Sequence, residues 1–203
     1  DGLADLIVGA ELGDPATRTN AGQSYVVFGK TNSSAIDLSA VEAGIGGFVI
    51  NGQCDSNWSG RSVASAGDLN GDGLADLIVG AVLGDPGVRP DAGRSYVVFG
   101  KTTTTAVELS TVAAGSGGFV INGQCTADYS GHSVSAAGDV NGDGLADLIV
   151  GAYLSDPAAV LPDAGRSYVI FGSKTGAFAK SVVDQLGTIN NDILNGTSVS
   201  ETH

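Results

Sequence analysis

Short apolar runs rich in β-branched residues recur along the chain, and clusters of Gly, Asp and Asn separate them. This pattern is typical of β-strands joined by tight turns. Runs such as LIVGA at 77–81 are apolar without alternation, as expected of strands that are buried on both faces. Within residues 54–124 the pattern predicts four strands, at 61–69, 76–82, 94–100 and 118–123. No stretch shows a helical periodicity of useful length, but residues 36–44 and residues 107–115 could each form one helical turn.

The pattern of strands and turns repeats along the chain with a period of 71 residues. The decapeptide DGLADLIVGA occurs three times, beginning at Asp1, Asp72 and Asp143. The hexapeptide SYVVFG or SYVIFG begins at Ser24, Ser95 and Ser167, the last after one extra residue. The nonapeptide GGFVINGQC occupies 46–54 and 117–125, and NDILNG at 191–196 is a weaker third copy of its GFVING part. A regular period of this length indicates a repeat architecture.

Four short strands per unit predict an all-β fold made of β-propeller blades, each with four antiparallel strands. We expect a first blade at 1–53 that lacks its first strand, a second at 54–124 and a third at 125–203 with a degenerate outer strand. Propellers typically close with about four to eight blades, so about three blades form a partial propeller or half of a six-bladed ring. Further blades would come from the same chain, of which this sequence is then a piece, or from a second copy.

Composition narrows the classes of partner. The 203 residues include 32 Gly, carry a formal net charge of −13 and are 42% hydrophobic. The acidic balance excludes a nucleic-acid partner, because phosphate binding needs a basic surface. The apolar runs are much shorter than the ~18 residues of a membrane span. Cys54 and Cys125 occupy equivalent places in successive units, so we expect free thiols rather than a disulfide, whose Cα atoms must lie within about 4.4–6.8 Å.

An acidic loop with alternating oxygen-bearing residues occurs twice in full, as DLNGDGLAD at 68–76 and DVNGDGLAD at 139–147. The alternation matches positions 1, 3, 5, 7 and 9 of a calcium loop, in which position 7 offers its backbone carbonyl. The predicted ligands are Asp68, Asn70, Asp72, Leu74 and Asp76 in one loop and Asp139, Asn141, Asp143, Leu145 and Asp147 in the other. A third, partial loop retains Asp1, Leu3 and Asp5, and we expect it to bind Ca²⁺ weakly or not at all.

The acidic loops have two other interpretations. An EF-hand is excluded because its position 12 needs a Glu between helices, whereas Val79 and Val150 stand there inside predicted strands. A metal-free Asx-turn hairpin would leave the carboxylates facing water. Several carboxylates within nine residues repel one another unless a cation lies among them. The sequence therefore favours calcium.

Further motifs resemble the FG-GAP repeats of the integrin α-subunit head and of bacterial surface proteins. WSG at 58–60 and YSG at 129–131 are similar to the FG element, and GAV at 80–82 and GAY at 151–153 are similar to the GAP element without its proline. The resemblance implies a propeller whose calcium loops join the first and second strands of a blade. It also implies a ligand-binding face on the opposite side.

That opposite face offers a candidate binding rim, at Trp58, Tyr129, Arg89 and Asp91. Aromatic and Arg side chains are enriched at interfaces, but the two aromatics could instead fill gaps between adjacent blades. A phosphate loop at 93–102 is excluded by the wrong glycine spacing and by its position in a predicted strand. With only His132 and the terminal His203 in the chain, a Ser–His–Asp nucleophile has little support.

The sequence thus predicts a non-enzymatic, calcium-binding propeller segment of a secreted or cell-surface protein. Its expected role is adhesion or matrix binding, with a protein or glycan ligand on the face opposite the calcium loops. Two alternatives remain open: a lectin-like carbohydrate-binding propeller, and an accessory domain of a larger extracellular hydrolase.

Overall fold

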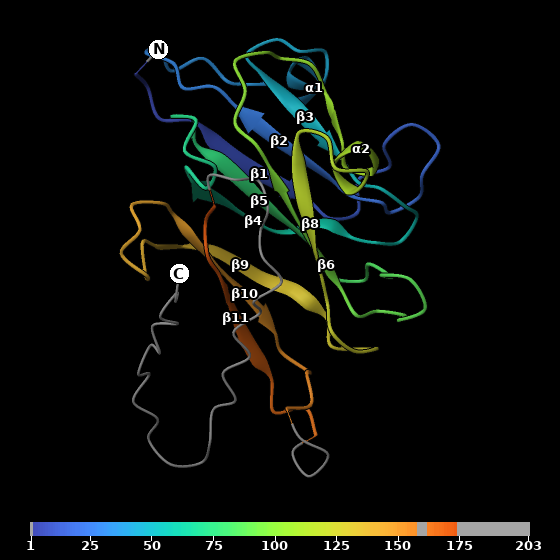
Figure 1. Ribbon diagram of the computed structural model, residues 1–203. Helices are drawn as coiled ribbons and strands as arrows, with labels where there is room; N and C mark the ends of the chain where they lie inside the picture. Colours follow the sequence, from blue (N-terminus) through green and yellow to red (C-terminus); the bar gives the residue numbers. More distant parts are fainter. Residues whose placement is uncertain (1, 158–161, 174–203) are drawn as a thin grey trace.

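The computed structural model describes residues 2–157 and 162–173, which form an all-β structure of three sheets (Figure 1). The middle sheet contains the antiparallel strands β4 (Ser59–Gly67), β5 (Asp76–Ala81), β6 (Arg94–Val98) and β8 (Gly118–Asn122), in that spatial order. These are the four strands that the sequence predicts. The first of them begins two residues earlier than expected, because Ser59 pairs with Ala81 across a register shift.

The first sheet contains β1 (Leu6–Ala10), β2 (Gln23–Val27) and β3 (Gly47–Asn51), which are antiparallel neighbours. The third sheet contains β9 (Ser130–Gly138), β10 (Asp147–Ala152) and β11 (Arg166–Ile170), with β10 between the other two. The predicted outer strand at 191–196 lies outside the described residues.

Two short helices precede the outer strands, where the sequence left room for one turn each. They are α1 (Leu38–Glu42) and α2 (Leu109–Ala113). The Asp37 carboxylate caps α1 by accepting a hydrogen bond from the Ser39 backbone N–H at 3.0 Å. Neither helix, within the described part of the chain, has the length and apolar character needed to cross a membrane.

A two-residue strand connects the first and second units. β7 (Val107–Glu108) follows β6 in sequence, yet it pairs in parallel with β3 of the first sheet. Val107 lies opposite Ile50, and Glu108 lies opposite Asn51. The first sheet therefore has four strands only because the following unit supplies the last one. The sequence analysis did not predict this strand.

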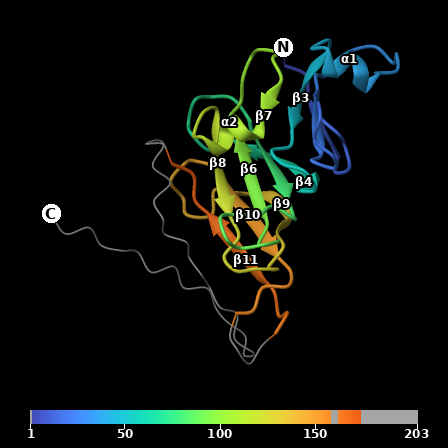
Figure 2. The same cartoon turned by 90° about the vertical axis from the view of Figure 1, so that its right-hand side faces the viewer.

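The sheets follow one another in sequence order, with the green middle sheet between the blue and orange ones (Figure 2). Both faces of β5 are buried, as the unbroken apolar run predicted. Val79 belongs to a core cluster with Phe48 and Ile50 of the first sheet. Ile78 belongs to a second cluster with Leu148 of the third sheet.

Glycines allow the backbones of neighbouring sheets to come close together. A Cβ atom on Gly9 would lie 2.1 Å from the carbonyl oxygen of Gly60, and one on Gly80 would lie 2.1 Å from that of Gly131. Real Cβ atoms do not approach backbone that closely, so each junction requires glycine in the GA that ends the LIVGA run, at Gly9 and at Gly80. The glycines of the WSG and YSG motifs are thus the partners of the glycines of the GA motifs.

Candidate functional site

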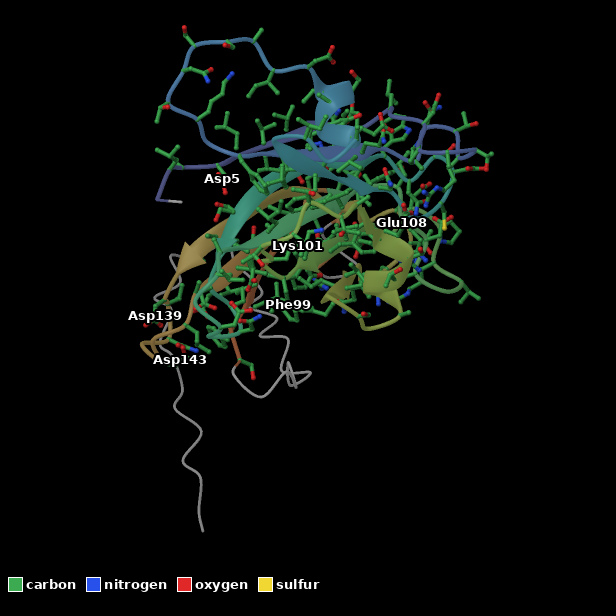
Figure 3. All side chains as sticks on the ribbon, turned by 90° about the horizontal axis from the view of Figure 1, so that it is seen from above. Asp5, Phe99, Lys101, Glu108, Asp139 and Asp143 are labelled. Atoms are coloured by element: carbon green, nitrogen blue, oxygen red, sulfur yellow. The ribbon has the colours of Figure 1, made fainter. Side chains whose placement is uncertain are left out.

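The two complete acidic loops lie where the sequence placed them, between the first and second strands of a hairpin. Residues 68–75 connect β4 to β5, and residues 139–146 connect β9 to β10. Figure 3 shows Asp139 and Asp143 together at the tip of one hairpin, with Asp5 of the partial loop at the same side of the molecule. Glu108 lies toward the other side. Asp1 of the partial loop lies outside the described residues.

The first carboxylate of each loop organises the turn that follows it. Asp68 Oδ1 accepts hydrogen bonds from the N–H groups of Gly71 at 2.7 Å and Asp72 at 3.1 Å, and Oδ2 accepts one from Gly73 at 2.9 Å. Gly71 and Gly73 have φ values of 78° and 87°, which glycine adopts without strain. The two glycines and one carboxylate thus curl the backbone into a tight loop.

Alternate side chains continue this pattern along the loop. Asn70 Oδ1 accepts a hydrogen bond from the Asp72 N–H at 2.8 Å, and Asp72 Oδ1 accepts one from the Leu74 N–H at 2.8 Å. The Asn70 amide also donates to Asp72 Oδ2 at 3.0 Å. The second loop repeats every one of these contacts, with Asp139, Asn141, Asp143 and Leu145 in the corresponding places.

The last acidic residue of each loop is buried and ties the loop to its own sheet. Asp76 has no exposed surface. Its Oδ2 accepts a hydrogen bond from the Leu69 N–H at 2.9 Å, and its Oδ1 accepts one from the Gly100 N–H at 2.8 Å. Burial raises the pKa of Asp76, the two amides lower it, and the nearby carboxylates of Asp72 and Asp68 raise it.

The other two units repeat this buried contact in full or in part. Asp147, also without exposed surface, accepts hydrogen bonds from the N–H groups of Val140 at 2.8 Å and Gly172 at 2.9 Å. Asp5 is exposed and accepts one from Gly29 at 2.8 Å. The partial loop thus keeps the link to its sheet.

The donor chemistry of the loops fits a hard divalent cation. Carboxylate, amide and backbone carbonyl oxygens are the ligands that Ca²⁺ prefers, and a carboxylate has about four lone-pair sites, so an oxygen that accepts an N–H can also bind a metal. Across residues 2–157 and 162–173, no three carboxylate, imidazole or thiolate side chains are grouped closely enough to form a metal site by themselves. An ion would therefore depend on the Asn and backbone oxygens as well.

The candidate rim residues lie at the other end of β5 from the acidic loop, and the structure divides them between two junctions. The Tyr129 N–H donates to the Asp91 carbonyl at 3.1 Å, and the Arg89 guanidinium donates to the Gln124 carbonyl at 2.9 Å. The backbone N–H of Trp58 instead donates to the Asn20 carbonyl at 3.3 Å. All four rim side chains are half-buried.

A polar cluster that the sequence analysis missed joins the first and second sheets. Glu108 forms an ion pair with Arg18, at 2.8 Å from Oε2 to Nη2, and its Oε1 accepts a hydrogen bond from the Asn51 amide at 2.6 Å. The Gln53 side-chain oxygen accepts from the Tyr96 hydroxyl at 2.6 Å and from Arg94 at 3.0 Å. The recurrence of Asn and Gln after each FVI run was the signal for part of this cluster.

One known family of repeats shares the motifs that build these loops and junctions. A family model described as FG-GAP repeat matches residues 59–98 and 130–170. The chain belongs to the FG-GAP repeat family. Each match in this FG-GAP chain runs from the first strand of a sheet through its acidic loop to the third strand, and so contains one complete loop.

Integrin α subunits are among the relatives of this FG-GAP chain. Integrin alpha-7 of Mus musculus is 34% identical over 162 residues, which are 79% of this chain and 12% of that protein. Integrin alpha-PS2 of Drosophila melanogaster is 32% identical over 137 residues, or 66% of this chain and 9% of that protein. Integrin alpha pat-2 of Caenorhabditis briggsae is 36% identical over 115 residues, 53% of this chain and 8% of that protein. The chain thus spans about a tenth of these relatives.

Proposed function

We propose that this chain is a calcium-binding, non-catalytic segment of an extracellular or cell-surface FG-GAP propeller with a role in adhesion. Each sheet acts as a blade, with divisions near residues 53 and 124, and further blades complete the ring. The similarity to integrin α subunits supports the adhesive role and the extracellular location. The proposed ligand, a protein or a glycan, binds on the side opposite the acidic loops.

The shape of the acidic loop carries the calcium proposal. One carboxylate and two left-handed glycines hold 68–74 in a closed turn, from which Asp68, Asn70, Asp72 and the Leu74 carbonyl supply hard oxygen atoms. Asp76 adds a buried carboxylate, whose pKa is raised by its burial first and to a smaller extent by the carboxylates of Asp72 and Asp68. A divalent cation bound in the loop would offset the mutual repulsion of the Asp68, Asp72 and Asp76 carboxylates.

Calcium should stabilise the folded state, because the unfolded chain has no formed loop to bind it. Extracellular calcium modules bind at about 10⁻⁴ to 10⁻³ M. At a calcium concentration of about 100 Kd, binding at one loop adds roughly 2.7 kcal/mol to the free energy of unfolding. The melting temperature of the full chain should therefore rise with calcium and fall when EGTA is added.

Charge-neutralising variants separate loop binding from a general salt effect. Asp72→Asn and Asp143→Asn should each remove part of the calcium-dependent rise in melting temperature, and the double variant should remove most of it. Glu42→Gln in α1 removes the same charge away from both loops and should keep the full rise. A melting temperature of the parent chain that is unaffected by calcium and EGTA would refute the calcium proposal.

A further inference from the structure

Three copies of the tripeptide pattern Asn-x-Ser/Thr occur in the chain, and the structure gives two of them opposite surroundings. They begin at Asn32, Asn57 and Asn195, and none has Pro at its second position. This pattern is the acceptor motif for N-linked glycans, and a copy that carries a glycan lies in a surface loop of a secreted protein. Asn195 lies outside the described residues, so the comparison concerns Asn32 and Asn57.

Asn32 lies in an exposed loop between β2 and α1. Every residue from 30 to 37 is exposed. The side-chain oxygen of Asn32 accepts a hydrogen bond from the Ser34 N–H at 3.1 Å, which forms an Asx turn. This bond uses the oxygen of the side-chain amide, whereas a glycan is attached to the nitrogen. The turn also brings together the first and third residues of the motif, the two that define it.

Asn57 has the motif but not the exposed loop. Asn57 is only 5% exposed and Ser59, the third residue of its motif, only 1%. Ser59 pairs with Ala81 at the start of β4, and its N–H donates to the Ala21 carbonyl of the first unit at 3.0 Å. The Asn57 carbonyl accepts a hydrogen bond from the Leu83 N–H at 3.3 Å. An oligosaccharide on Asn57 would have to displace this junction, so the folded chain has no room for one.

The second unit contains an equivalent loop without the motif. Thr103 stands 71 residues after Asn32, in a run of four exposed Thr. In both loops the Lys that opens the loop, Lys30 or Lys101, donates through Nζ to the backbone carbonyl four residues later. The two loops thus share exposure and a backbone contact, and the second lacks only the Asn of the motif.

We propose that Asn32 is an N-glycan attachment site of this chain and that Asn57 is not, because the exposed loop decides which copy of the motif is used. The proposal rests on the extracellular location proposed above, since N-glycans are added to chains that enter the secretory pathway. The reaction joins Asn32 Nδ2 to the anomeric carbon of an oligosaccharide carried on a lipid diphosphate. The bond from that carbon to the diphosphate oxygen breaks, the lipid diphosphate leaves, and the amide nitrogen loses one proton.

The position of the loop places this glycan at the acidic-loop end of the first sheet. Gly29, three residues before Asn32, donates its N–H to the Asp5 carboxylate of the partial loop at 2.8 Å. Figure 3 shows Asp5 at the side of the molecule away from Glu108. The candidate rim lies at the other end of the sheets, so the glycan leaves the proposed ligand-binding face uncovered.

Secretion of the full chain from cultured insect or mammalian cells, behind a cleavable signal peptide, tests the proposal. Glycopeptide mass spectrometry of the secreted protein should find a glycan at Asn32 that peptide-N-glycosidase removes, and none at Asn57. Asn32→Gln and Ser34→Ala should each abolish the glycan at position 32. Ser34→Ala keeps both Asn32 and the backbone N–H that its side chain binds, so it separates the motif from the turn.

A gain of the motif in the second loop provides the matched control. Thr103→Asn, with Thr105 as the third residue of the motif, should add a glycan at position 103. The calcium-dependent rise in melting temperature of the same secreted protein reports on the proposed function separately, so either proposal can fail alone. An unmodified Asn32, a glycan on Asn57, or a Thr103→Asn variant without a glycan at position 103 would each overturn the proposal.

Discussion

Replacement of Asp76 by Ala tests whether the last acidic residue of the loop has a structural role of its own. The carboxylate is fully buried and accepts one amide hydrogen bond within its loop, from Leu69, and one from beyond it, from Gly100. Hydrogen bonds to a charged group contribute roughly 1.5–3 kcal/mol each. The variant also relieves the cost of burying a charge beside other carboxylates, which offsets part of that loss. We expect a net loss of about 3 kcal/mol in the free energy of unfolding.

The measurement is urea unfolding of the full chain in EGTA, so that any loss of bound calcium does not contribute. Asp5→Ala is the matched control, because Asp5 holds the same position in the first unit but is exposed and bonded to one amide, that of Gly29. It should cost less than about 1 kcal/mol. Asp147→Ala, which removes an equally buried carboxylate with two amide partners, should cost as much as Asp76→Ala.

Two outcomes would refute this account of Asp76. If Asp76→Ala and Asp5→Ala cost the same in EGTA, the buried hydrogen bonds contribute nothing beyond an exposed one. If Asp76→Ala destabilises the chain only when calcium is present, the residue acts through the metal alone. Either result would rule out a structural contribution of the buried Asp76 hydrogen bonds beyond that of an exposed one.

Two further predictions concern a junction and a helix cap. Gly80→Ala should destabilise the chain by several kcal/mol in urea unfolding, because the new Cβ would meet the Gly131 carbonyl of the next sheet; Gly151→Ala, which meets only a serine hydroxyl of its own sheet, should cost much less. Hydrogen bonds from the Ser39 hydroxyl and N–H hold the pKa of Asp37 below its usual value, so the cap stabilises α1 above the ordinary pKa and fails as the pH falls through the lower folded value. The protection factors of the α1 amides, which correct for the intrinsic pH dependence of exchange, should therefore fall on acidification, and Asp37→Ala should remove that fall.

Much of the fold followed from the sequence, because each strand is an apolar run bounded by Gly, Asp or Asn. The strands of the middle sheet were predicted in number, order and approximate position for this reason. β7 was missed, because two residues cannot display a periodicity. It pairs with β3 of the preceding unit and forms the ion pair between Glu108 and Arg18, residues that lie far apart in the chain.

The location of the acidic loops was also predictable, but the role of their last residue was only partly so. The spacing assigned Asp76 to a metal, and nothing in the loop itself indicates its bond to Gly100, 24 residues later. A signal did exist at longer range. The equivalent Asp of each unit, buried in Asp76 and Asp147 and exposed in Asp5, accepts a hydrogen bond from the glycine that ends the VFG or IFG run of its own unit, at Gly100, Gly172 and Gly29.

The units of this chain are completed by their neighbours, and the two copies of GFVIN make that argument. Their local sequence and strand geometry are the same, so propensity cannot explain why Ile50 is buried and Ile121 is not. The difference comes from β7, which belongs to the following unit. Contacts inside a unit, such as that of Asp76 with Gly100, fix the acidic loop, whereas contacts between units decide which edge is exposed.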